Sequence, residues 1–187
     1  MLLPLISARL VLRRFGVGDA AAFAAYRADP DVARYQGWDG CSLDEALTFI
    51  RRQRRQPPGR AGRWTQIALV VRDGDALAGD CGLLIHADGR QATIGITLAR
   101  PYQGRGLATE ALTLLLDHLF GSMAVHRVQA EVDPRNHRSW VLLERLGMRR
   151  EGHQRQSTWF KGEWADEYLY AVLRQEWLAQ HPHAGTG

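Results

Sequence analysis

Cysteine is scarce in this sequence, and long apolar runs are missing from it. The chain has 2 cysteines among 187 residues, and Cys41 and Cys81 lack the spacing of metal ligands. We therefore expect two reduced thiols, no bound metal and a cytoplasmic location. No apolar segment is long enough to span a bilayer. The start of the chain, Met1 to Ile6, is too short for a signal peptide and has no basic residues.

A strong excess of charge of one sign is also absent. The formal net charge is +4, with 45% hydrophobic and 24% charged residues, which is the composition of a globular protein. Six arginines lie between Arg51 and Arg63, and they offer a contact for nucleic acid or for the phosphates of a cofactor. We favour the alternative, a solvated helix end at which the helix dipole favours cations. The charge is too small to predict a nucleic-acid-binding protein.

No internal repeat or interior linker divides the chain, so we expect one domain over residues 1–180 and a disordered tail at 181–187. Alternating residues bounded by turns predict strands at 7–14, 64–72, 76–87, 92–99, 126–132, 148–160 and 164–173. Helical patterns predict helices at 20–28, 42–55, 107–120 and 139–146. Asp19, Ser42 and Asn136 are the predicted caps of the first, second and fourth helices.

This order of elements predicts an α+β fold. We expect a mixed, mostly antiparallel central sheet of about seven strands with helices on both faces. The two strands that flank the helix at 107–120 should be parallel neighbours, joined by a right-handed crossover.

The most informative stretch is the glycine-rich turn between the strand at 92–99 and the apolar helix that follows. Glycines let the backbone approach a ligand closely. The first N–H groups of a helix lack internal partners, and the helix dipole places its positive end there, so the turn favours a phosphate. We therefore predict a pyrophosphate site, against the alternative of a plain turn. The dinucleotide spacing and the phosphate-loop lysine are both absent.

The turn Gln103-Gly104-Arg105-Gly106-Leu107-Ala108 resembles the acyl-CoA pyrophosphate motif of the GNAT N-acetyltransferase superfamily, Gln/Arg-x-x-Gly-x-Gly/Ala. Further matches follow in order: Asn136-x-x-Ser139, Leu143-Glu-Arg-Leu-Gly147 and Glu151-Gly152. They resemble the branch typified by RimJ and RimL, the ribosomal-protein N-terminal acetyltransferases.

The resemblance implies acetyl-CoA as co-substrate and an amine as acceptor. It also implies that the parallel strand pair splays apart to admit the pantetheine arm. The residues implied to bind the coenzyme are Ile96, Thr97, Leu98, Gln103, Gly104, Arg105, Gly106, Leu107, Ala108 and Asn136. Asn136 is also suited to cap a helix, and both roles can hold if the cap lies at the ligand.

Two residues are candidates for catalysis. An amine arrives as an ammonium ion and must lose a proton before it attacks, so a base is needed. Glu131 should face away from the apolar side of its strand and matches the base proposed in some GNAT enzymes, although a surface glutamate is an equal alternative. Ser139 matches the serine of the RimL type, and we expect it to hydrogen-bond the leaving thiolate. Leu143 and Thr158 depart from the family pattern of acid and base.

The acceptor is left open by the sequence: a protein N-terminus, a polyamine, an aminoglycoside and an amino acid all remain. Trp38 and Trp159 are the candidates for lining its cleft, although large aromatics more often form core. We expect an N-acetyltransferase that acts by direct attack of a primary amine in a ternary complex, with a main-chain N–H of residues 96–98 stabilising the oxyanion. The alternative is a non-catalytic acyl-CoA-binding module. A monomer and a homodimer are both compatible with the sequence.

Overall fold

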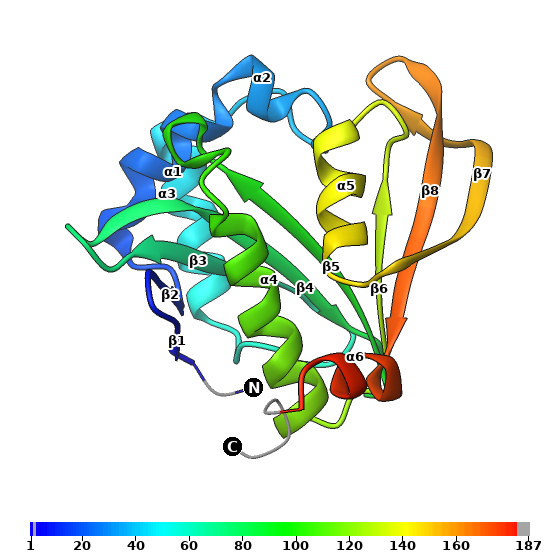
Figure 1. The fold of residues 1–187 in the computed structure, drawn as a ribbon. Helices are drawn as coiled ribbons and strands as arrows, with labels where there is room; N and C mark the ends of the chain where they lie inside the picture. Colours follow the sequence, from blue (N-terminus) through cyan, green and yellow to red (C-terminus); the bar gives the residue numbers. More distant parts are fainter. Residues whose placement is uncertain (2, 183–187) are drawn as a thin grey trace.

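The computed structural model describes residues 1 and 3–182 and consists of one mixed sheet with helices on both faces (Figure 1). The sheet has eight strands in the order β1-β2-β3-β4-β5-β6-β8-β7. The strands are β1 (Leu5–Ile6), β2 (Leu10–Arg13), β3 (Trp64–Val71), β4 (Ala76–Ile85), β5 (Gln91–Leu98), β6 (Arg127–Val132), β7 (Arg149–Phe160) and β8 (Glu163–Leu173). Every pair of neighbours is antiparallel except β5 and β6. The predicted class and the predicted parallel pair are therefore confirmed.

The helices divide between the two faces of the sheet because the strands alternate apolar residues to both sides. They are α1 (Ala20–Arg27), α2 (Pro30–Ala33), α3 (Leu43–Arg54), α4 (Leu107–Asp117), α5 (His137–Arg145) and α6 (Arg174–Gln180). Ile67 and Leu69 of β3 belong to the core shared with α4. The intervening Ala68 and Val70 belong to a second core, which contains residues of α1 and α3.

The parallel strands β5 and β6 pair over a short distance and then separate. Their register ends at Thr93 and Gln129, while β5 continues to Leu98 and β6 to Val132. Figure 1 shows the two strands diverging from the end near α6, with α5 beside the gap. A gap therefore opens in the middle of the sheet, next to the first turn of α4.

Several local predictions need correction. The expected first strand at 7–14 is shortened to β2, because the Ser7 N–H donates to the Leu10 carbonyl and closes a turn over its first residues. The short strand β1, which was not predicted, precedes this turn and raises the strand count to eight. Asp19 lies at the start of α1, but its carboxylate binds Arg13 (2.7 Å) and the Gly16 N–H (2.6 Å) instead of capping the helix. The π-helical turn His118–Ser122 extends the predicted helix at 107–120.

The end of the chain contains a helix that the patterns did not indicate. Helix α6 begins where the Glu176 carboxylate accepts the Leu173 N–H, and Trp177 of this helix is fully buried in the α4 core. The tail predicted to be disordered begins at His181, whose ring stacks on Trp177. Residues 183–187 of that predicted tail lie outside the described residues.

Candidate active site

The glycine-rich turn has the geometry that a phosphate site requires. Gly104 and Gly106 both have positive φ angles, +71° and +76°, and Gly106 is the N-cap residue of α4. A Cβ on Gly104 would meet no atom within 4 Å, so this turn faces open space. Within the described part of the chain, no acceptor is hydrogen-bonded to the N–H groups of residues 104–108. These amides are therefore available to an anion.

The N-terminal hairpin braces this turn from the side. The Arg9 guanidinium donates to the Arg105 carbonyl (2.9 Å) and to Glu110 in the first turn of α4 (2.6 Å). Glu110 also accepts the Ser7 hydroxyl (2.7 Å), and these contacts hold its pKa below the usual value even though burial acts in the opposite direction. The conformation of the turn is thus fixed by β1 and β2 without use of the amides at residues 104–108.

The free edge of β5 continues the site toward the gap. The Ala99 N–H donates to the Ala78 carbonyl (2.9 Å), and the His86 N–H donates to the Gln91 carbonyl (2.8 Å). An antiparallel ladder alternates, so the odd-numbered residues of β5 bond to β4 and the even-numbered ones point toward β6. The main-chain groups of Ile96 and Leu98 therefore face the gap, while those of Thr97 pair with β4.

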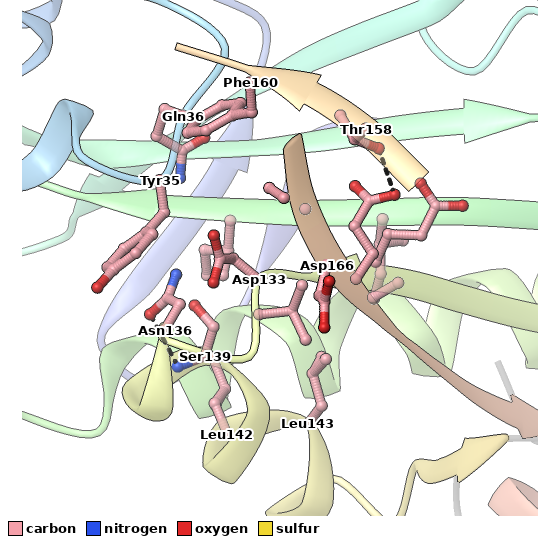
Figure 2. Close-up of a pocket in the computed structure, with 18 of the residues that line it drawn as sticks. Tyr35, Gln36, Asp133, Asn136, Ser139, Leu142, Leu143, Thr158, Phe160 and Asp166 are labelled. Atoms are coloured by element: carbon pink, nitrogen blue, oxygen red, sulfur yellow. Dashed lines mark hydrogen bonds between the residues drawn. The ribbon is translucent and has the colours of Figure 1, made fainter. Parts of the chain in front are cut away.

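Helix α5 brings two of the predicted residues to the same gap. Asn136 caps the helix, and its Oδ1 accepts the Ser139 N–H (3.3 Å). Both side chains line the pocket, as do Leu142 and the buried Leu143 (Figure 2). The cap uses the oxygen of Asn136, so its amide nitrogen is left to bind a second group.

A pocket of about 180 Å³ occupies the gap between β5 and β6. Its residues come from both splayed strands, α4, α5, the β7–β8 hairpin and the segment after α2. They are Tyr35, Gln36, Ile94, Gly95, Ile96, Leu112, Ala130, Glu131, Val132, Asp133, Asn136, Ser139, Leu142, Leu143, Thr158, Phe160, Ala165, Asp166 and Glu167. The predicted catalytic residues Glu131 and Ser139 thus line one cavity, together with Ile96 and Asn136.

Carboxylates dominate the charge of this pocket. Glu131, Asp133, Asp166 and Glu167 line it, and its described lining includes no arginine or lysine. Asp133 is paired with Arg135 (2.6 Å), and Asp166 with His153 (2.7 Å). Both of these carboxylates therefore have a partner that can offset their charge.

The other two carboxylates, Glu131 and Glu167, interact with each other. Glu167 accepts the Thr158 hydroxyl (2.7 Å), which leaves its negative charge in place. Partial burial and the charge of Glu167 raise the pKa of Glu131, while His86 acts in the opposite direction. A carboxylate whose pKa is raised toward neutrality accepts a proton more readily, as a general base must.

The predicted acceptor residues lie outside the pocket lining. Trp38 packs against Arg27, whose guanidinium carbon lies 3.8 Å from the indole centroid. Trp159 is 62% exposed and packs edge-to-face on Trp164. Contact of either tryptophan with a substrate stays a prediction.

Sequence reasoning missed Tyr35, Gln36, Phe160, Asp166 and Glu167 as pocket residues. No motif marks the first three, which come from the loop after α2 and from the end of β7. Neighbouring residues on a strand face opposite sides of the sheet, so the alternation in β8 could have placed either Asp166 or Glu167 on the same face as Glu131. Placing Glu167 beside Glu131 needed the register of β6 with β8, in which Val132 pairs with Tyr168.

Among residues 1 and 3–182, no helix has the length and apolarity that crossing a membrane requires. In the same described residues, no group of three or more His, Cys, Asp or Glu side chains is placed to hold a metal ion. The arginines from Arg51 to Arg63 are exposed, and Arg51, Arg52 and Arg54 lie in the last turn of α3.

Comparisons with known proteins agree with this geometry. A family model for an acetyltransferase (GNAT) domain matches residues 9–149. An uncharacterised N-acetyltransferase, p20 of Bacillus licheniformis, is 31% identical over 175 residues, which cover 92% of this chain and 97% of that protein. The ribosomal protein uS5 alanine N-acetyltransferase of Escherichia coli is 34% identical over 84 residues, 45% of this chain and 43% of its own length.

A solved structure supports the same assignment. The crystal structure of a GNAT-family acetyltransferase from Bacillus anthracis superposes with a TM-score of 0.84 at 26% identity, covering 92% of this chain and 99% of that one. These relatives are acetyltransferases. The chain that resembles them has free amides at Gly104 and Gly106 and a pocket between its splayed strands. The chain belongs to the GNAT family of N-acetyltransferases, in the branch that resembles RimJ and RimL.

Proposed function

We propose that this protein transfers an acetyl group from acetyl-CoA to a primary amine by direct attack within a ternary complex. The observation that carries the proposal is the continuity of three features. The free amides at residues 104–108 lead along the open edge of β5 into the pocket that holds Glu131 and Ser139. A coenzyme bound along this path would have its thioester close to the pocket.

The residues present fit the coenzyme. The amides of residues 104–108 would bind the pyrophosphate, aided by the dipole of α4. The amide nitrogen of Asn136 and the main-chain N–H of Leu98 would bind the pantetheine arm, which resembles a peptide in its hydrogen-bonding groups. The Leu98 carbonyl already accepts the side-chain amide of Gln103 (2.9 Å). When bound, acetyl-CoA supplies the activated acetyl group.

Separate groups of the protein would then assist the separate steps of acetyl transfer. The Ile96 N–H would donate to the acyl oxygen as that oxygen gains negative charge. Glu131 would accept the proton that the ammonium loses, directly or through a water. Ser139 would donate a hydrogen bond to the sulfur as the C–S bond breaks and the C–N bond forms. The second proton leaves the nitrogen for solvent after the C–N bond has formed. Leu143 has no proton to give, so the thiolate would take its proton from solvent.

The charge of the pocket favours a cationic acceptor. Glu131 and Glu167 bring two carboxyl groups to a cavity whose described lining has no arginine or lysine to offset them. A carboxylate within a few ångströms stabilises an ammonium more strongly in such a site than in bulk water. We propose a small amine that carries a second positive charge as the preferred acceptor, ahead of a neutral monoamine.

The proposal is tested by measuring binding and turnover separately. Acetyl-CoA binding is measured by isothermal titration, and transfer is followed by the release of free CoA thiol with a panel of amines. The panel should pair each diamine with the monoamine of equal length. We expect micromolar binding and turnover that favours the diamine. Absence of binding at high micromolar ligand would refute the coenzyme site, and equal rates within each pair would refute the cationic preference.

A non-catalytic acyl-CoA-binding module is the second candidate, and Leu143 and Thr158 favour it because neither can act as the acid or base found in the family. It predicts tight binding of CoA without thiol release for any amine. The variant Glu131→Gln separates the two functions. It should lower turnover by about a hundredfold or more if Glu131 is the base, and it should leave the binding of acetyl-CoA unchanged.

A further inference from the structure

One end of the pocket is closed by a short segment that follows α2. Residues 34–39, which we name the acceptor wall, contribute Tyr35 and Gln36 to the pocket lining. Figure 2 shows Gln36 beside Phe160 of the β7–β8 hairpin, and Tyr35 on the side of Asn136. The Tyr35 hydroxyl donates to the Arg135 carbonyl (3.3 Å), in the connection between β6 and α5. The acceptor wall therefore connects two parts of the protein: it follows α2 in the chain and contacts the β6–α5 connection on the other side of the pocket.

The wall is fastened to the hairpin by Lys161, the only lysine in the sequence. Its Nζ donates to the carbonyl oxygens of Ala33 (2.8 Å) and Trp38 (3.0 Å) and lies 2.8 Å from Oδ1 of Asp39. Ala33 comes directly before the wall and Trp38 lies near its other end, so one ammonium group holds both ends of the segment. The side chain is 27% exposed, which favours the contacts by limiting competition from water.

The backbone of this lysine is in an uncommon conformation. Lys161 and Gly162 form the two-residue turn between β7 and β8, and both have positive φ angles, +49° and +87°. Turns of this kind favour asparagine, aspartate or glycine at both central positions. A lysine is less favourable in this position than those residues, and its side-chain contacts help to offset that cost.

The acceptor wall also contacts α1, through Trp38 and Arg27. The Arg27 guanidinium lies between the rings of Phe23 (4.1 Å) and Trp38 (3.8 Å) and pairs with the buried carboxylate of Asp80 (3.5 Å). This stack fixes the side chain of Trp38, and Lys161 fixes its carbonyl. The wall is thus restrained on two sides, with Tyr35 and Gln36 directed into the pocket.

We propose that Lys161 is a positioning residue for the acceptor: by closing the acceptor wall against the β7–β8 hairpin, it sets the shape of the pocket end that receives the amine. This inference rests on the proposed function, because it assumes that the amine binds in this pocket. The pyrophosphate site at residues 104–108 lies on different elements and should not depend on the contacts of Lys161. Loss of the Lys161 contacts should therefore weaken binding of the acceptor amine and leave acetyl-CoA binding unchanged.

The test compares Lys161→Met, Lys161→Arg and Asp39→Asn with the parent protein. Methionine has a similar length and the same backbone strain but cannot donate, whereas arginine can still donate to two carbonyls. Asp39 is 86% exposed, so its removal should cost little. We expect Lys161→Met to raise KM for the amine by about tenfold, with kcat and the Kd of acetyl-CoA unchanged. Lys161→Arg should recover most of the loss, and Asp39→Asn should match the parent.

Hydrogen exchange gives a readout that needs no turnover. The amides of residues 34–39 should exchange faster in Lys161→Met than in the parent, and those of α4 should not change. Unchanged exchange at the wall, or an unchanged KM for the amine, would overturn the inference. If the parent protein acetylates no amine, the proposed function fails, and the positioning role fails with it. Faster exchange at residues 34–39 would then still identify Lys161 as a structural fastener.

Discussion

Gly104 offers the sharpest test of the coenzyme site, through the variants Gly104→Glu and Gly104→Gln. A side chain at this position points into open space, so neither variant should create a clash. Both must adopt a φ near +71°, which costs roughly 1–2 kcal/mol for a residue with a Cβ. The two side chains have nearly the same size, so the difference between them isolates the effect of the charge.

That difference can be estimated from Coulomb's law. A carboxylate about 6 Å from one unit of phosphate charge, at an effective dielectric constant of about 20, is repelled by about 2.8 kcal/mol. This corresponds to a Kd about a hundredfold weaker for the glutamate variant than for the glutamine variant. Isothermal titration with acetyl-CoA measures both values, and thermal unfolding shows that both variants fold.

Salt provides the internal control for this prediction. Raising the ionic strength from about 0.02 M to about 0.5 M shortens the screening length to a few ångströms, so the ratio of the two Kd values should shrink. Equal Kd values for the two variants at low salt would refute the reasoning. They would mean that the phosphates bind away from the turn and that the free amides at residues 104–108 have another partner.

Three further predictions follow from the site and its supports. Because the charge of Glu167 raises the pKa of Glu131, Glu167→Gln should move the acid limb of the kcat/KM profile to lower pH, whereas an unmoved limb would exclude Glu131 as the base. Asn136→Ala should lower the free energy of unfolding by about 1 kcal/mol through loss of the cap and also weaken CoA binding, while Asn136→Ser should restore the stability in urea unfolding but not the binding. Arg27→Met leaves the carboxylate of Asp80 buried without a cation and should lower the unfolding free energy by about 3 kcal/mol or more. If loss of the ion pair is the cause, the added change Asp80→Asn should partly restore the stability.

The parts of the structure that could be predicted are those set by neighbouring residues. The capping box of Ser42 and Glu45 and the cap by Asn136 formed where the sequence indicated. The glycine turn did so too, because a positive φ at residues 104 and 106 is a local property. The parallel pair was predicted because a strand, a helix and a second strand leave few other arrangements.

The parts that could not be predicted depend on register and on long-range contacts. The pairing of β5 with β6 stops after Thr93, and nothing in the alternation of either strand marks that point. Glu167 reaches Glu131 only because β8 inserts between β6 and β7. Lys161 reads as an ordinary turn residue until the segment after α2 is placed beside it, more than 120 positions away in the sequence.

The near absence of lysine has a consequence for a catalyst of amine acetylation. The single lysine side chain, Lys161, already contacts two oxygen atoms of the acceptor wall and the carbonyl oxygen of Ala33, which precedes it, so the enzyme presents no free lysine to its own chemistry. Self-acetylation at Lys161 would first have to open the wall and would then prevent it from closing. An amine-directed label that reacts at this one side chain would therefore report how often the pocket opens.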